Sequence, residues 1–120
     1  MLTLLLACVS TAAETPSVTI ASPLDGATVC GTPLAVKVDV DGIVLVDPYG
    51  DVTDPGTGHV DVMLNGQDVA MTATERFEVD DVPEGAYQLK VELSNADHTP
   101  VEPYAGDLIY VSVSEAACTG

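Results

Sequence analysis

The chain has very few basic residues and very few large aromatic ones. Its 120 residues include only three Lys and Arg against 19 Asp and Glu, a single Phe and no Trp. Phosphate groups are bound by basic surfaces, so a net charge of −16 argues against nucleic acids as partners and against docking on anionic lipid head groups. An apolar content of 47% predicts one folded domain with a core of Val, Leu, Ile and Ala rather than a disordered acidic chain.

Helical periodicity is absent, and apolar and polar residues instead alternate in short segments separated by Gly, Pro, Asp and Asn. Alternation with a period of two is typical of a strand with one buried face. The clearest segment runs from Tyr87 to Leu93, where apolar residues occupy every second position. We expect strands at 18–20, 34–40, 58–64, 67–71, 77–79, 87–93 and 108–114.

Turn residues connect these segments into a β-sandwich. Asn65-Gly66 suits a type I′ hairpin turn, because both central residues of that turn need positive φ. Tyr87 stands where the penultimate strand of many sandwiches carries a tyrosine that anchors a corner through its hydroxyl. About seven short strands predict an all-β fold, an immunoglobulin-like antiparallel β-sandwich, with another sandwich topology as the alternative.

The amino terminus indicates export. Residues 1–8 form a short apolar run that ends at Cys8 and resembles the end of a bacterial lipoprotein signal, in which the cysteine carries the lipid. We therefore expect a partial signal at 1–8, a linker at 9–16, the sandwich at 17–116 and a tail at 117–120. The predicted location is the periplasm or the cell surface, with the lipid anchor as the membrane contact; the alternative is secretion after cleavage at 11–13, which removes Cys8.

Cysteine usage agrees with an oxidising compartment. With Cys8 assigned to lipid, Cys30 and Cys118 remain as an even pair, and a disulfide is the expected state of such a pair in a small exported chain. In the predicted topology the two cysteines lie at the same end of the sandwich. The alternative is two unrelated cysteines.

Three residues predict a metal site at the other end of the sandwich. His59 begins the 58–64 strand, Asp61 follows on the same face, and His98 lies in the loop before the last strand. Neighbouring strands of this topology bring these residues together. Two imidazoles and one carboxylate suit zinc or copper(II) and leave a ligand position open. Two ordinary polar histidines, hydrogen-bonded across the strands, are the alternative.

The loop that follows residue 46 gives a second hypothesis for a cation site. Asp47, Asp51 and Asp54 stand in a segment rich in Gly and Pro, where carboxylate and carbonyl oxygens suit calcium. Their spacing is not that of an EF-hand. A plain acidic loop is the alternative.

Several of these motifs occur together in one family. Ser22-Pro23-Leu24-Asp25-Gly26, Gly58-His59-Val60-Asp61 and Ala96-Asp97-His98-Thr99-Pro100 resemble an uncharacterised family of exported bacterial β-sandwich domains with a Gly-His-x-His strand. The resemblance extends over roughly 18–113 and implies a sandwich with histidines gathered at one end, and by inference metal binding. This chain has Asp61 where the family pattern has its second histidine.

Motifs for catalysis are missing from the sequence. It contains no Gly-x-Ser-x-Gly turn and no Gly-rich phosphate loop, and the adjacent pair Asp80-Asp81 stands in a predicted turn rather than across a cleft. We expect a monomer that is not an enzyme. Two functions remain: an exported envelope protein that binds a metal ion or small ligand, and a structural or adhesive surface module, with calcium as a possible stabiliser, that contacts an envelope protein.

Overall fold

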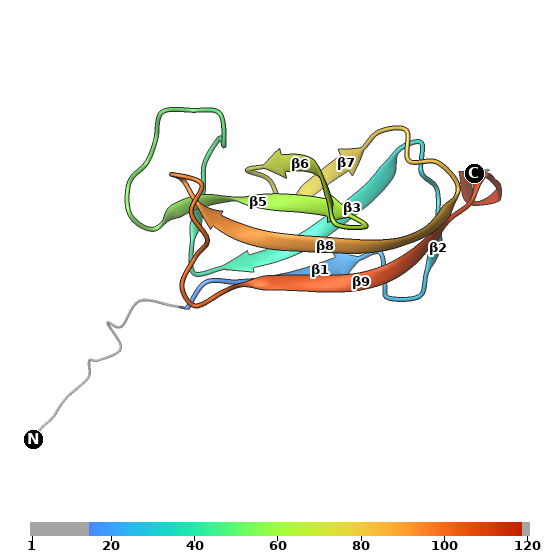
Figure 1. Ribbon diagram of the computed structural model, residues 1–120, viewed down its shortest axis with the longest axis horizontal. Coiled ribbons are helices and arrows are strands. Elements are labelled where there is room, and N and C mark those ends of the chain that lie inside the picture. The colour runs from blue at the N-terminus through green and yellow to red at the C-terminus, as the bar shows by residue number, and fades with distance from the viewer. Residues whose placement is uncertain (1–14, 119–120) are drawn as a thin grey trace, which may run out of the picture.

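A computed structural model describes residues 15–118 (Figure 1). The predicted signal segment with Cys8, the linker up to residue 14 and the end of the predicted tail lie outside the described residues. Within 15–118 no helix is long and apolar enough to cross a membrane. The described helix is a short 3₁₀ turn, Glu115–Cys118.

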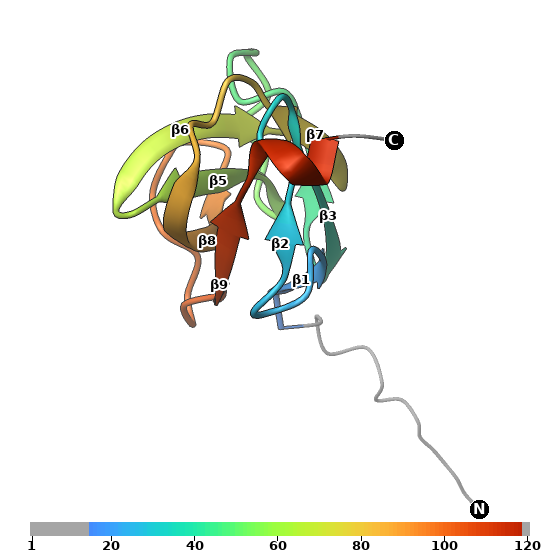
Figure 2. The same ribbon diagram turned by 90° about the vertical axis from the view of Figure 1, so that its right-hand side faces the viewer.

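The strands form two sheets that pack face to face (Figures 1 and 2). The three-stranded sheet has the order β1-β3-β7, and the six-stranded sheet has the order β2-β9-β8-β5-β4, with β6 also paired to β5. The bounds are β1 Ser17–Ser22, β2 Thr28–Val29, β3 Leu34–Asp41, β4 Val44–Leu45, β5 Thr57–Leu64, β6 Gln67–Thr72, β7 Arg76–Val79, β8 Gly85–Asn95 and β9 Gly106–Val113. The predicted all-β sandwich is confirmed, and each of the seven expected strands is present.

The core fills the space between the two sheets and consists of small branched side chains. Every second residue of each long strand points inward, as the alternation predicts. In β3 these are Leu34, Val36 and Val38, and in β8 they include Leu89 and Val91. Leu34, Val38, Leu89 and Val91 have no exposed surface, so Val and Leu replace the missing aromatic rings.

The predicted turn and corner are both present. Asn65 and Gly66 have φ values of 51° and 83°, and Leu64 pairs directly with Gln67, which makes a two-residue hairpin between β5 and β6. The Tyr87 hydroxyl donates a 2.7 Å hydrogen bond to the carbonyl oxygen of Pro83, as a tyrosine corner requires.

Two short strands, β2 and β4, were not expected from the sequence. β2 runs parallel to the end of β9, and β4 runs parallel to the start of β5, whereas the long strands pair antiparallel as expected. Each has two residues, too few to show any period. The chain passes from β3 to β4 through Gly42, whose φ of 78° lies in the left-handed region that glycine adopts readily.

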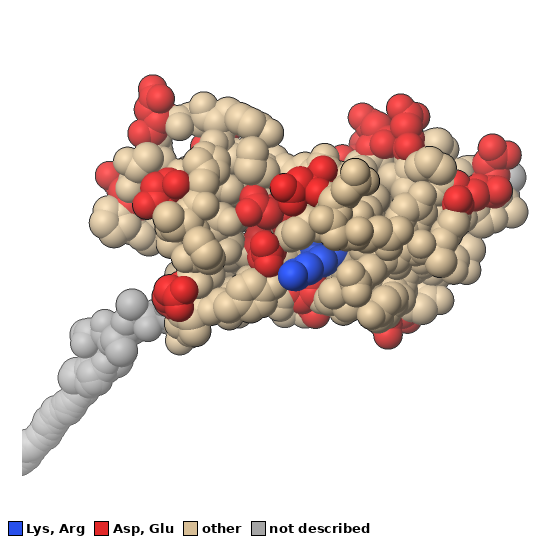
Figure 3. Space-filling model, viewed as in Figure 1, with Lys and Arg blue, Asp and Glu red and all other residues tan. Residues whose placement is uncertain are grey.

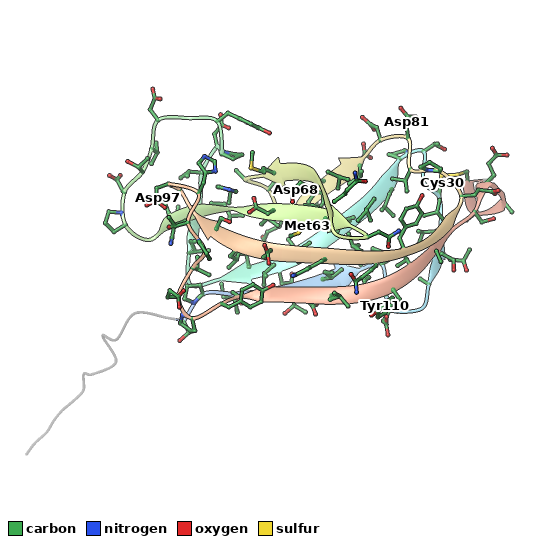
Figure 4. All side chains as sticks on the ribbon, viewed as in Figure 1. Cys30, Met63, Asp68, Asp81, Asp97 and Tyr110 are labelled. Atoms are coloured by element: carbon green, nitrogen blue, oxygen red, sulfur yellow. A yellow bond between two sulfur atoms is a disulfide. The ribbon has the colours of Figure 1, made fainter. Side chains whose placement is uncertain are left out.

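A disulfide joins Cys30, just after β2, to Cys118 at the end of the 3₁₀ turn, and so confirms the predicted pair. It closes a loop with a sequence separation of 88 residues and lies at the opposite end of the sandwich from Asp97 (Figure 4). Closing so long a loop reduces the entropy of the unfolded chain and is worth about 2–4 kcal/mol.

Gly58 permits the close approach of β5 to β8, and replacing it tests the packing at this point. A Cβ on Gly58 would overlap the carbonyl oxygen of Ser94 and lie 2.6 Å from Cδ1 of Ile43. We expect Gly58→Ala to lower the free energy of unfolding by roughly 1–3 kcal/mol, because a backbone atom cannot move aside as a side chain can. Urea unfolding followed by circular dichroism measures the change.

Gly50→Ala is the matched control, because a Cβ there meets its nearest neighbours, atoms of Asp47, at an ordinary 3.4 Å. We expect its unfolding midpoint to stay at that of the parent. Equal midpoints for Gly58→Ala and the parent would contradict the close approach of the two strands.

Candidate functional site

The predicted histidine cluster lies on the outer face of the six-stranded sheet, at one end. His59 and Asp61 alternate with inward-facing Val60 along β5. Ser94 of β8 is the register partner of His59, and the pairing places its side chain on the same face. The loop after β8 then returns across this end and carries His98.

His59 is covered although it belongs to the outer face. Its side chain has no exposed surface, and the ring of His98 lies over it with 4.9 Å between the ring centroids. His98 itself is exposed and has a φ of 70°, a left-handed conformation that non-glycine residues adopt at a cost. Hydrogen bonds hold this turn: the amide of His98 donates to the carbonyl of Asn95, and the amide of Asn95 donates to the carbonyl of Thr99.

Under the His98 loop, three polar side chains form a row in which His59 and Ser94 are buried and Asp61 is half-buried. The Ser94 hydroxyl donates a 2.6 Å hydrogen bond to Oδ2 of Asp61. Nε2 of His59 lies 3.1 Å from Oδ1 of the same carboxylate without forming a regular hydrogen bond. Both ring nitrogens of His59 and Oδ1 of Asp61 are therefore buried without a hydrogen-bond partner among the described residues.

Burial fixes the charge state of His59. Desolvation lowers the pKa of its imidazole, and the nearby His98 lowers it further, while Asp61 opposes both effects. Because desolvation is the largest cause, the ring is neutral at pH 7. A neutral imidazole keeps a lone pair on one nitrogen, and that lone pair is what binds a cation or accepts a proton.

The order of the three groups decides what chemistry they can perform. In a nucleophilic triad the histidine stands between the serine and the carboxylate and takes the hydroxyl proton. Here Asp61 lies between Ser94 and His59 and accepts the hydrogen bond of the Ser94 hydroxyl directly. The row therefore holds a carboxylate in place and does not activate the serine.

The predicted metal ligands are only partly assembled. His59 lies beside both Asp61 and His98, as expected from the topology. Among residues 15–118, however, no three side chains of His, Cys, Asp or Glu converge into a group that could hold a metal ion. Zinc or copper at this site remains a prediction.

The acidic loop before β5 shows no gathering of ligands either. Oδ1 of Asp47 accepts a hydrogen bond from the amide of Tyr49, and the main-chain carbonyl of Asp54 accepts two from Thr57. These contacts shape the loop locally. The geometry of Asp47, Asp51 and Asp54 gives the calcium prediction no support within the described residues.

Sequence reasoning did not find Ser94. It stands in an alternating strand among other polar residues, where nothing distinguishes it. Its role depends on the register of β8 against β5, which places it opposite His59 and within reach of Asp61. Beside Asp61 the surface also has a shallow depression of about 280 Å³, bordered by Tyr49, Asp68 and Met71.

Comparison with known proteins shows the fold. No family model and no curated protein matches the chain. A solved structure of Clostridium thermocellum CbhA fibronectin(III)-like modules has a TM-score of 0.53 at 18% identity, over 81% of this chain and 96% of that one. An engineered protein has a TM-score of 0.53 at 21% identity, over 86% of this chain and 21% of its own length.

A modular endo-β-1,4-mannanase from Cellulomonas fimi has a TM-score of 0.51 at 21% identity, over 90% of this chain and 20% of the mannanase. The chain thus spans about a fifth of the engineered protein and of the mannanase, and nearly all of the fibronectin-like module. These likenesses are to domains with the same fold class, an all-β immunoglobulin-like sandwich.

The neutral, buried state of His59 predicts how stability responds to pH. Because the pKa of His59 is lowered in the folded state, the unfolded state binds more protons as the pH falls through about 6.5. We expect the free energy of unfolding to decrease over that range, relative to a His59→Leu variant, by at most about 1.4 kcal/mol per pH unit. Urea unfolding at pH values between 5.5 and 8 measures this difference.

His98→Asn is the control, because asparagine tolerates the positive φ of this turn and leaves His59 in place. We expect this variant to retain most of the dependence. A parent and a His59→Leu variant whose difference in stability stays constant from pH 8 to pH 5.5 would show that His59 is not held neutral by burial.

Proposed function

We propose that the chain is an exported, non-catalytic β-sandwich module that acts through its surface. The observation that carries this proposal is the closed sandwich itself, which matches a fibronectin(III)-like module over 96% of that module's length. The likeness is to a unit that occurs as one module of a larger protein. A structural or adhesive surface module is the function that best fits such a unit.

The chemistry of the described residues supports the non-catalytic part of this proposal. The buried Ser94 of the outer face donates its hydrogen bond to Asp61 and not to a histidine. Export is supported by the Cys30–Cys118 disulfide, because disulfides form and persist in oxidising compartments. Anchoring through lipid on Cys8 is the finer part of the proposal and is supported by the sequence pattern alone.

Partners of the module are proposed from its surface. With 19 acidic and three basic residues, the chain is expected to contact neutral or basic surfaces of the envelope, and the proposed form is a monomer. Nucleic acid does not fit this charge.

A second candidate function is binding of zinc or copper by His59, Asp61 and His98. One observation favours it: both nitrogens of His59 and Oδ1 of Asp61 are buried without a hydrogen-bond partner. Leaving such a group unpaired costs roughly 1–3 kcal/mol, and a bound cation would offset that cost. Binding would require His98, whose ring already lies over His59, to turn a nitrogen toward the same point.

Thermal unfolding of the full untagged chain separates the two functions. For a structural module we expect the same melting temperature after treatment with EDTA and after addition of zinc, copper(II) or calcium. For the metal site we expect zinc or copper to raise the melting temperature in a saturable way, because an ion that binds only the folded state stabilises it.

His59→Leu and His98→Asn serve as paired controls for the metal titration. A rise caused by zinc or copper that disappears in both variants would establish the second function. A rise caused by calcium that survives in both would place the ion elsewhere, with Asp47, Asp51 and Asp54 as the residues to change next. A melting temperature that EDTA lowers would contradict a metal-independent module.

A further inference from the structure

Exposed apolar side chains form a row along β9, on the outer face of the six-stranded sheet, which begins near the histidine end and runs away from it. Tyr104, Leu108 and Tyr110 have 58%, 38% and 57% of their surface exposed. We call these three residues the tyrosine track. From Gly106, on which Tyr104 lies, to Tyr110 the strand advances four residues, or about 14 Å.

The ring of Tyr104 is fixed in position. Its hydroxyl donates a 2.7 Å hydrogen bond to Oε2 of Glu92, and Nζ of Lys90 lies 5.8 Å from the ring centroid. The ring covers Gly106 so closely that a Cβ there would overlap its hydroxyl and lie 2.8 Å from its Cζ. The absence of a side chain at Gly106 therefore lets Tyr104 lie on the sheet.

Tyr110 is fixed from both its main chain and its side chain. Its amide donates to Oδ1 of Asp25, and its hydroxyl accepts a 3.3 Å hydrogen bond from Nε2 of Gln88. In Figure 4 it projects from β9 near the lower rim of the molecule. A shallow groove of about 350 Å³ continues the track past Tyr110, between the β5–β6 turn and the loop before β2. Its lining includes Gly26, Asn65, Ala86 and Ser112.

A column of polar side chains runs beside the track on β8. Gln88 pairs with Tyr110, Lys90 pairs with Leu108, and Glu92 pairs with Gly106. Paired residues of neighbouring strands point to the same face of the sheet. Each position of the tyrosine track therefore has a hydrogen-bonding side chain of β8 next to it. The two columns form a flat strip, apolar on one side and polar on the other.

The charge of this strip is nearly balanced, although the chain as a whole is strongly acidic. Lys90 lies 3.5 Å from Glu92, and the neighbouring carboxylate of Asp25 accepts a hydrogen bond from the main chain. Figure 3 shows this side of the molecule, where one small patch of basic atoms lies over β8 and β9, with acidic atoms beside it on one side and largely uncharged surface on the other. The net charge of −16 repels polyanions, whereas a neutral polymer meets no such repulsion here.

We propose that the tyrosine track binds a chain of neutral sugars that lies along β9. The faces of aromatic rings carry negative partial charge and attract the polarised C–H groups on one face of a sugar ring. Gln88, Lys90 and Glu92 would then donate to and accept from the hydroxyl groups at the edge of that ring. Rings that are already held in place lose little entropy on binding. The inference names a partner for the proposed module and rests on that proposed function.

Affinity electrophoresis of the full chain in native gels tests the inference. The probes are galactomannan, xyloglucan, mixed-linkage β-glucan and dextran, with polygalacturonate as a polyanion. We expect at least one neutral polysaccharide to retard the acidic protein and polygalacturonate to have no effect. Tyr104→Ala and Tyr110→Ala should each weaken the binding about tenfold, the effect of losing one stacked ring.

Two variants sharpen this test. Gly106→Ala keeps both tyrosines but pushes the Tyr104 ring off the sheet, so it should weaken binding as Tyr104→Ala does. Tyr49→Ala removes a tyrosine that is 76% exposed but borders the depression beside Asp61 and Met71 rather than β9, so it should bind like the parent. Circular dichroism and the melting temperature of each variant confirm that it folds.

Three results would overturn the inference. The first is that none of the four neutral polysaccharides retards the protein, and the second is that Tyr49→Ala loses as much binding as Tyr104→Ala. The third is self-association in sedimentation experiments that Tyr104→Ala abolishes. That result would make a second copy of the chain the occupant of the track. If binding fails while the melting temperature stays independent of metal, the sugar inference alone fails and the structural module stands.

Discussion

The antiparallel pairing of β5 with β8 is the contact on which the rest of the structure depends. Its seven consecutive pairs, from Gly58 with Asn95 to Leu64 with Leu89, lie in the middle of the larger sheet. This register sends Val62 into the core and His59 to the outer face, and a slip of one residue would exchange the two. The core, the buried histidine and the polar column of β8 all follow from the same alignment.

The sequence predicted the long strands well because their apolar residues alternate over five or more positions, as they do from 87 to 93. The Asn65-Gly66 turn was equally predictable, since only a few residues accept positive φ. β2 was not predictable. Its two residues, Thr28–Val29, form a strand only because β9 offers them an edge, and that edge depends on contacts far apart in the sequence.

The sequence predicted which residues of the candidate site lie close together, but not the burial and hydrogen bonds that they have there. Strand topology alone brings His59 and His98 to one end, and they lie in contact. The full burial of His59 results from the way the loop turns at His98, whose left-handed backbone leaves no trace in the apolar pattern. Ser94 gains its role from its register against β5, so it resembles any polar strand residue until that register is known.

Many of the acidic residues have a structural role that composition does not reveal. Several carboxylates accept hydrogen bonds from main-chain amides at strands and loop ends that lack a neighbouring strand. These pairs are Asp25 with Tyr110, Asp107 with Ile20, Glu75 with Val40, and Glu84 with Glu115. A carboxylate on an open strand edge satisfies the amide and also discourages pairing with another chain.

Because several carboxylates bind main-chain amides, the net charge of the chain does not describe the chemistry of its binding surfaces. A count of 19 acidic residues describes a protein that repels polyanions from a distance. At short range, Asp25 accepts a hydrogen bond from the main chain of Tyr110, Asp107 accepts one from β1 of the other sheet, and Glu92 is shared between Lys90 and Tyr104. The outer face of β9 therefore presents rings, an amide and a balanced ion pair, and its preference for a partner follows from these groups rather than from the overall charge.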